Sequence, residues 1–579
     1  NPGEVAAQTT TDGDGNYSMD VAPGFYLITW DNYGYLPQEL GDYTLNSDTT
    51  LDLISMQPGF VQEVCGDVSG DWVSGFVYHV TCDITVPDGD TLNIEEGVTV
   101  RFGLGTGLTC NGVLNAQGTE EDRILFTTLS ATPLPGDWDN VALYAGDNTI
   151  SYVDYEYATD GFTGDFAGNS SFDHVRISAG LMSLDANGIY LSNSSNMSFT
   201  NNEISVAGDY NIYCQNCDFS VYTGNELIGA EYGIRSHDSY YLTIENNIIE
   251  DFLEYGVRFL NSPYSKVNHN YFSGSPNGGD KWAIANNHDG QYAEVNYNKI
   301  EFSGDHSYQN GIWVRDVDVI GDTILYLEGS SAGGHAIHCD RGNIQDNYIE
   351  SAGYGHGRQL IVNYGTDNSR GVIRNNTILA HDQNSGIYAY RSDIEDNYMH
   401  GIAHGDGYNN YWAIDCPDGY NTIRNNTIID FESGINFDDE WDMTIVDNTI
   451  KVRGGRVLNG NNSYGDHIIQ NNILEVSNRS SEAIYISNST SVEFSDNQVL
   501  SSGKGAYFNN TSVTMDHNLI VSSGRGLELT NQSGGTILNN TMISTNNGDY
   551  GITVSNLSSP IIRNNILQGY NTGMQIDND

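Results

Sequence analysis

Basic residues are scarce in this sequence. Lysine and arginine together number 22, against 76 aspartates and glutamates, which gives a formal net charge of -54 at pH 7. A chain this negative repels nucleic acids and anionic membranes, because both are polyanions. We therefore expect no nucleic-acid partner and a surface whose solubility comes from carboxylates.

Long apolar runs are absent as well. No stretch of eighteen apolar residues occurs and the mean hydropathy is -0.40, so we expect no direct insertion into a membrane. The chain begins at Asn1 without methionine, shows no signal peptide, and ends at Asp579 inside a repeat. We interpret it as a processed or excised part of a longer protein.

Seven cysteines are too few for a disulfide framework in a chain of 579 residues. Cys65 and Cys82 flank the expected start of the repeats, where a disulfide would tie down the first coil in an oxidising compartment. Cys214 and Cys217 form a C-x-x-C pair, which cannot complete a four-ligand zinc site by itself. For this pair we expect either buried, small hydrophobic side chains or a local disulfide.

A short repeat dominates the rest of the chain. From about residue 200 onward, a polar turn followed by an apolar residue recurs about every 24 residues, which is the period of a solenoid. The repeated turn position is occupied by asparagine in every coil but one: Asn202, Asn225, Asn247, Asn270, Asn298, Asp322, Asn347, Asn376, Asn397, Asn426, Asn448, Asn472, Asn497, Asn518, Asn540 and Asn565.

The segments between these turns alternate between apolar and other residues. Gly188–Leu191, Gly311–Val314 and Gly551–Val554 each place an apolar residue at every second position, which is typical of strands and not of helices. Asparagine and glycine at the corners supply the left-handed backbone that sharp turns need. Asparagines stacked coil upon coil can also hydrogen-bond to one another as ladders.

The region from Val64 to Thr127 resembles the first coils of secreted bacterial proteins of the pectate-lyase-like superfamily. The resemblance lies in the runs Leu92–Val100, Gly112–Thr119 and Ile124–Thr127, and the later repeats are similar to the parallel β-helix repeats of that superfamily. It implies an all-β fold, a right-handed parallel β-helix over residues 64–579 with about 20 coils. It leaves the activity open, because the superfamily includes lyases, hydrolases, epimerases, adhesins and phage spikes.

Residues 1–60 differ from the repeats. The runs Thr11–Tyr17, Val21–Ile28 and Tyr33–Tyr35 resemble a carboxypeptidase-regulatory-like domain, a small β-sandwich, here without its first strands. Asp12, Asp14 and Asn16 also allow a calcium loop, but no bidentate glutamate follows at the twelfth position. Such domains act as spacers in surface proteins, so the resemblance implies a secreted or cell-surface location.

The repeat also predicts which side chains face outward, because the residue after each inward isoleucine points away from the core. Cationic and aromatic residues concentrate on the coils between Arg235 and Asp415, next to long loops at Ser273–Trp282 and Ser351–Arg358 that could wall a groove. A second outward row adds Arg315, Asp340 and Tyr390. The first row reads Tyr190, Tyr213, Arg235, Arg258, Ala285, Trp313, His338, Tyr388, Asp415, Asn436, Tyr485, Tyr507, Glu528, Thr553 and Gln575.

These residue types suit a saccharide. Aromatic rings stack on sugar rings, while arginine and aspartate bond hydroxyls or carboxylates. The carbohydrate-binding candidates are Trp313, Tyr388, Arg258 and Asp415. The alternative is that they cover a half-exposed sheet for which tyrosine and arginine are well suited.

A catalytic function would use the same face. His338 or Asp340 would then act as general base, and Arg315 or Arg235 would stabilise an enolate-like charge at C5 of a uronate. No cofactor is required for this chemistry.

An acidic loop offers one metal hypothesis. Asp438, Asp439, Glu440 and Asp442 carry the oxygen ligands that calcium prefers. A solvated run of charge is the alternative. His335, His338 and His356 lie on neighbouring coils, but without the ligand spacing of a zinc site.

Three functions are consistent with these features. The first is an extracellular or cell-surface structural or adhesive β-helix protein, whose partners are polysaccharides, other surface proteins or further copies of itself, since an uncapped coil exposes strand edges. The second is a polysaccharide lyase, epimerase or hydrolase. The third is a non-catalytic carbohydrate-binding module. We favour the first, because no compact catalytic motif is present.

Overall fold

The computed structural model describes residues 7–11, 16–30, 38–51, 56, 59–178, 186–274, 281–286, 292–303, 309–326, 334–351, 359–381, 384–402, 412–478 and 481–577. Every regular element in these ranges is a β-strand, which confirms the all-β fold. They include no helix long and apolar enough to cross a membrane. The chain forms two compact units, residues 1–266 and 267–579, and each is described by itself.

A small antiparallel sheet lies near the N-terminus. Strand β1 (Gly24–Trp30) pairs with β2 (Gln38–Leu45), with a shift of register between Tyr26 and Ile28. This two-stranded sheet stands where the partial β-sandwich was predicted. Asp12 and Asp14 of the alternative calcium loop lie outside the described residues.

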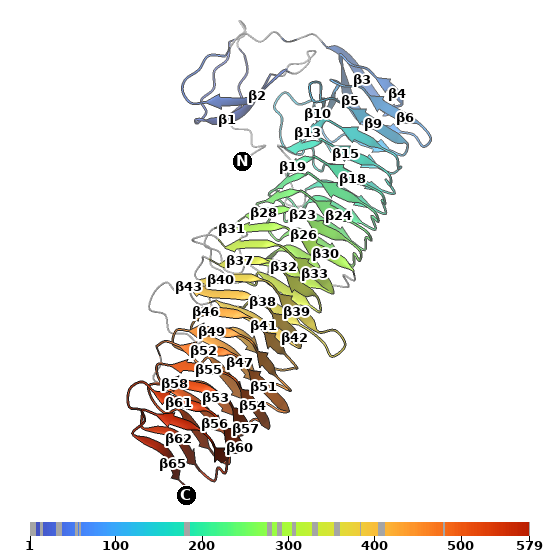
Figure 1. Ribbon diagram of the computed structural model, residues 1–579. Coiled ribbons are helices and arrows are strands. Elements are labelled where there is room, and N and C mark those ends of the chain that lie inside the picture. Colours follow the sequence, from blue (N-terminus) through green and yellow to red (C-terminus); the bar gives the residue numbers. More distant parts are fainter. Residues whose placement is uncertain are drawn as a thin grey trace. The chain divides into compact units, whose positions relative to one another are not determined.

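The remainder is a parallel β-solenoid of about 20 turns. A typical coil of the first unit has three strands, β18 (Ser198–Thr200), β19 (Glu203–Ser205) and β20 (Tyr210–Gln215), and each pairs in parallel with the equivalent strand of the next coil. Figure 1 shows these levels of strands within each unit. The solenoid begins with β3 (Phe60–Asp67), which pairs in parallel with β5 (Phe76–Val86), slightly before the predicted Val64.

The third strand of each coil carries the predicted outward rows. In the first unit these strands are β17 (Asn187–Ser192), β20, β23 (Tyr232–His237) and β26 (Tyr255–Leu260). In the second unit they are β29 (Lys281–Asn286), β32 (Gln309–Arg315), β35 (Ile337–Asp340), β38 (Gln359–Tyr364), β41 (Ser385–Tyr390), β44 (Trp412–Cys416), β47 (Ser433–Asp438), β50 (Leu458–Asn461), β53 (Glu482–Ser487), β56 (Lys504–Asn509), β59 (Leu527–Thr530), β62 (Tyr550–Ser555) and β65 (Thr572–Asp577).

The core is the inside of the coil. In the first unit Ile189, Ile212, Ile234 and Val257 align on successive third strands and are fully buried. Burying one such side chain contributes about 1.5–3 kcal/mol. Because each coil contributes similar residues, the solenoid buries a continuous core without a second layer of structure.

The repeated asparagines form a buried row that we call the corner row. The residue before each one adopts the left-handed conformation, as at Asn201 (φ 53°) and Asn425 (φ 56°), and the asparagine itself turns inward. In the first unit, Asn202 Nδ2 donates to Asn225 Oδ1 (2.8 Å), and Asn225 repeats the bond to Asn247 (2.8 Å). The second unit continues the same bonds from Asn347 to Asn565, which confirms the predicted ladder.

Candidate functional site

The outward row of the first unit has the predicted alignment. Tyr190, Tyr213, Arg235 and Arg258 are register partners on β17, β20, β23 and β26. A second aligned row of tyrosines, Tyr210, Tyr232 and Tyr255, was not predicted. These tyrosines lie two residues before the inward isoleucine or valine, so strict alternation would place them inside. Their recurrence on three successive coils was the signal that could have revealed them.

The two tyrosine rows surround the arginines. The Arg235 guanidinium lies 5.4, 5.6 and 5.1 Å from the ring centres of Tyr210, Tyr213 and Tyr232, and its Nη1 donates to Tyr210 Oη (2.6 Å). Arg258 lies 4.7 Å from the Tyr255 ring, and its Nη1 donates to Tyr232 Oη (3.3 Å). Cation–π contacts of this kind hold a guanidinium in one orientation.

The hydroxyls of Tyr213 and Tyr232 keep their protons over the physiological range. Burial raises the pKa of Tyr213 to about 12, and the neighbouring Tyr190 adds to the effect. Burial also raises the pKa of Tyr232, as does the hydrogen bond from its hydroxyl to Glu254 (2.7 Å). These groups therefore act as neutral hydrogen-bonding partners.

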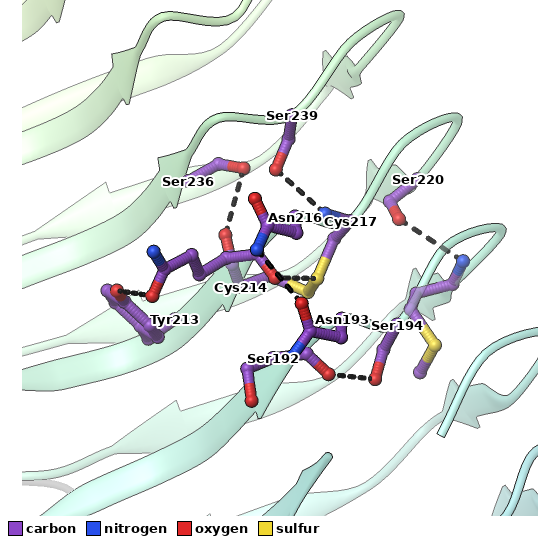
Figure 2. Close-up of a disulfide and its surroundings, with 12 residues drawn as sticks. Ser192, Asn193, Ser194, Tyr213, Cys214, Asn216, Cys217, Ser220, Ser236 and Ser239 are labelled. Atoms are coloured by element: carbon purple, nitrogen blue, oxygen red, sulfur yellow. Dashed lines mark hydrogen bonds between the residues drawn. A yellow bond between two sulfur atoms is a disulfide. The ribbon is translucent and has the colours of Figure 1, made fainter. Parts of the chain in front are cut away.

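A disulfide joins Cys214 and Cys217 at the end of β20, as Figure 2 shows. Both cysteines are fully buried, so this pair is a local staple inside the coil. The Cys217 N–H donates to Ser239 Oγ (2.9 Å) on the next coil. Tyr213, immediately before Cys214, belongs to the outward row. A second disulfide links Cys65 and Cys82, on β3 and β5.

The outward row of the second unit also follows the prediction, with two omissions. Trp313 aligns with His338, and the row continues to Tyr388, Asp415 and Asn436. Val362 lies between His338 and Tyr388, and Asn459 lies between Asn436 and Tyr485. In both coils a larger apolar residue, Leu360 or Val457, precedes the inward residue, where most coils have glycine or alanine.

Aromatic rings form a continuous strip along this row. The ring centres are 5.3 Å apart for Trp282 and Trp313, 5.9 Å for Trp313 and His338, 5.6 Å for His338 and Tyr364, and 5.9 Å for Tyr364 and Tyr388. We call these five residues the aromatic strip. Trp282 and Tyr364 were not among the predicted binding residues. The buried Trp282 Nε1 has no hydrogen-bond partner among the described residues.

Acidic and basic groups lie against the strip. Asp340 Oδ1 is 3.3 Å from His338 Nε2, and Asp340 Oδ2 is 3.2 Å from Arg315 Nη2. Burial alone would raise the pKa of Asp340, but hydrogen bonds and charge from His338 and Arg315 outweigh it and lower that pKa. Three of the four predicted catalytic candidates are thus in contact, while Arg235 belongs to the other unit.

Asp415 has the opposite electrostatic environment. Burial raises its pKa, and Asn436 Nδ2 donates to its Oδ1 (2.9 Å). Asp340 and Asp415 are three coils apart, or roughly 14 Å at about 4.8 Å per coil. That separation exceeds the range of about 5–9.5 Å for the two carboxyl groups of a glycoside hydrolase, so these two do not form such a pair.

The four acidic residues proposed for calcium point in different directions. Asp439 and Asp442 are exposed at left-handed corners, and Asp438 is half-buried. Glu440 turns inward, where it accepts a hydrogen bond from Asn421 Nδ2 (2.6 Å), and burial raises its pKa to about 9. Across the described ranges, no group of three or more histidine, cysteine, aspartate or glutamate side chains is placed to hold a metal ion.

Several predicted features lie outside the described residues. His356 and most of the two loops proposed as groove walls, 275–280 and 352–358, are among them. Within the described part, the second unit offers a row of aromatic rings, inclined to one another by 36–66°, with one acid–base contact beside it. Such a surface can stack on sugar rings and exchange a proton with a ligand.

Two family models match parts of the chain. Residues 145–316 match the family described as periplasmic copper-binding protein (NosD), and residues 456–579 match the right-handed β-helix region. The second match agrees with the handedness that the resemblance implies. A stretch of 98 residues is 34% identical to Protein bark beetle of Drosophila melanogaster, covering 16% of this chain and 3% of that protein. The chain therefore spans only a small fraction of that relative.

Three solved structures illustrate the similarity at the level of coordinates. The mannuronan C-5 epimerase AlgE4 A-module of Azotobacter vinelandii has a TM-score of 0.28 at 12% identity, covering 63% of this chain and 91% of its own. The alginate lyase AlyGC of family PL6 has a TM-score of 0.29 at 9% identity, covering 83% of this chain and 97% of that one. The tailspike protein of E. coli bacteriophage HK620 has a TM-score of 0.26 at 14% identity, covering 76% of this chain and 69% of that one. These scores are too low to transfer an activity.

Proposed function

We propose that this chain is an extracellular β-helix protein of the structural or adhesive kind, which binds polysaccharide along the aromatic strip. The observation that carries the proposal is the strip itself, with five rings on successive coils and neighbouring centres 5.3–5.9 Å apart. Four of the rings, those of Trp313, His338, Tyr364 and Tyr388, are at least partly exposed, and exposed aromatic rings can pack against sugar rings. Arg315 and Asp340 at its edge supply polar partners for hydroxyl groups.

The disulfides support the extracellular part of the proposal. Cys65–Cys82 and Cys214–Cys217 would persist in an oxidising compartment and be rare in a reducing one. The N-terminal antiparallel sheet would serve as a spacer to other modules. Attachment to other surface proteins and assembly with further copies are extensions of the same proposal.

Binding to a panel of neutral and acidic polysaccharides tests the proposal. We expect Trp313→Ala to weaken binding about tenfold or more, since a tenfold loss corresponds to about 1.4 kcal/mol. Trp441→Ala is the matched control, because Trp441 is 47% exposed in the same unit but lies outside the strip. Equal losses in the two variants, or no binding of any polysaccharide by the native chain, would overturn the proposal.

A second candidate is catalysis on a polyuronate, favoured by the contact of Asp340 with both His338 and Arg315. His338 would take the C5 proton, and Arg315 would stabilise the electron pair left on the carboxylate as an enolate. That pair would then expel the oxygen at C4, leaving an unsaturated product, or C5 would be reprotonated from the other face.

Incubation with acidic polysaccharides distinguishes the two functions. Unsaturated or epimerised products that disappear with Asp340→Ala and Arg315→Ala would establish an enzyme. Binding without any change in the polysaccharide would leave the adhesive function.

A further inference from the structure

Arg235 and Arg258 place two positive charges next to each other in one sheet. They are register partners on neighbouring strands, which lie about 4.8 Å apart, and like charges directly opposite each other destabilise a sheet. In a chain with only 22 basic residues, this arrangement calls for a compensating anion.

Among the described residues, no carboxylate pairs directly with either arginine, and Glu254 reaches Arg258 only through the Tyr232 hydroxyl. Elsewhere in the first unit, Arg123 pairs with Asp154 (2.7 Å) and Arg176 with Glu203 (3.3 Å). Within the described ranges, Arg235 and Arg258 form no ion pair, and the buried Nε of each lacks a hydrogen-bond partner. A buried polar atom without a partner destabilises the fold unless a water or ligand satisfies it.

The surrounding tyrosines hold both guanidinium groups ready for a ligand. Each arginine donates through Nη1 to a tyrosine hydroxyl, and ring contacts of 4.7–6.0 Å fix the plane of each fork. The other guanidinium donors of both arginines have no partner among the described residues. A planar fork with free donors suits the paired oxygens of a carboxylate or a sulfate ester.

We propose that Arg235 and Arg258 together bind an anionic substituent of a polysaccharide, a carboxylate or a sulfate ester. The site belongs to the first unit alone. It rests on the proposed function only in taking a polysaccharide as the ligand, and it adds that this polysaccharide is acidic.

Three oligosaccharide probes of equal length test the site by titration calorimetry: a uronic acid oligomer, a sulfated oligomer and a neutral oligomer. The double variant Arg235→Gln with Arg258→Gln should lose at least tenfold in affinity for whichever anionic oligomer the native chain binds. Its affinity for the neutral oligomer should not change. The preferred anionic probe identifies the substituent as carboxylate or sulfate.

Two further variants keep the test decisive. Arg176→Gln removes a paired arginine from the same unit and should leave anionic binding unchanged. Arg235→Lys with Arg258→Lys keeps the charge, removes the fork and should lose part of the affinity, while circular dichroism verifies that each variant is folded. Binding by the native chain should weaken as salt is added, because the contact is ionic.

The outcomes separate this site from the proposed function. Unchanged anionic binding in the Arg235 and Arg258 glutamine variant overturns the inference, even where Trp313→Ala weakens neutral binding and supports the aromatic strip. If the double glutamine variant loses anionic binding while Trp313→Ala keeps full binding, the inference is supported and the proposed binding along the aromatic strip is overturned. Absence of binding to all three probes overturns both.

Discussion

The corner row and the outward face of the same coils follow opposite rules. Along the corner row almost every coil repeats one residue in one hydrogen-bonding pattern, with amide-to-amide distances of 2.8–3.2 Å in the second unit. Along the outward face the residue changes from coil to coil, and cations such as Arg235 lack acidic partners among the described residues. The residues that repeat along the corner row stabilise the coil, and the outward residues that vary from coil to coil are available to bind a ligand.

Breaking the corner row should have the largest effect. Asn426 accepts from both the N–H and the Nδ2 of Asn397 (3.0 and 2.9 Å) and donates to the carbonyl oxygen of Ile394 (2.8 Å). Asn426→Ala would leave these buried groups without partners, at about 1–3 kcal/mol for each. We expect a loss of about 3 kcal/mol or more in denaturant unfolding, with faster hydrogen exchange at the Asn397 amide.

The neighbouring corner residue supplies the control. Asn425 is exposed, with φ 56°, a conformation that glycine adopts without strain. Asn425→Gly should cost much less than Asn426→Ala. Similar losses in the two variants would mean that the row does not stabilise the coil.

Glu440 is a buried acid on the inner side of a coil, and its effect should depend on pH. Burial raises its pKa from 4.5 to about 9, so the folded state binds a proton that the unfolded state releases. The stability contributed by Glu440 is therefore complete below pH 4.5 and is lost as the pH rises toward 9, by about 1.4 kcal/mol per pH unit. Glu440→Gln should flatten this slope, as measured by unfolding between pH 5 and 8. Parallel curves for the two proteins would refute the burial of an acid here.

Asp322 is the one carboxyl group in the corner row. Asn298 Nδ2 donates to its Oδ1 (2.9 Å), but its buried Oδ2 has no partner in the described part of the chain. Burial raises its pKa well above the ordinary value of 3.8, so its contribution to stability also falls as the pH rises above that value. An amide would donate at every pH, as Asn347 Nδ2 does to the carbonyl oxygen of Val319 (3.0 Å), whereas the carboxyl group can donate only while it is protonated.

Asp322→Asn should therefore stabilise the protein. We expect little change near pH 4 and a gain of about 1–3 kcal/mol at pH 8, the cost of one unsatisfied buried group. Thermal unfolding across this range measures the difference. A destabilised variant at pH 8 would mean that Asp322 is held ionised by a group that the amide cannot replace.

Periodicity was sufficient to predict the corner row and most of the outward row, because most coils repeat a small residue, an inward aliphatic residue and an asparagine. It failed where a coil departs from alternation. Tyr210 lies two residues before the inward Ile212, so alternation places it inside as well. Its ring lies instead beside Arg235, with its centre 5.2 Å from that of Tyr232. The contact between His338 and Asp340 followed from their spacing of two on one strand. The contacts of the Trp282 and Tyr364 rings with their neighbours depend on side-chain orientation, which the pattern does not specify.

Changes on the outward face should have the smallest effect on stability. Arg258→Gln removes ring contacts to Tyr232 and Tyr255 at 6.0 and 4.7 Å, but it also removes the repulsion between two aligned arginines. Because these effects oppose each other at a half-exposed position, we expect the free energy of unfolding to change by no more than about 0.5 kcal/mol. Denaturant unfolding at low salt, where the repulsion is least screened, is the appropriate measurement. A loss comparable to that of Asn426→Ala would place Arg258 among the residues that build the coil, and would remove the reason to look for an anion beside it.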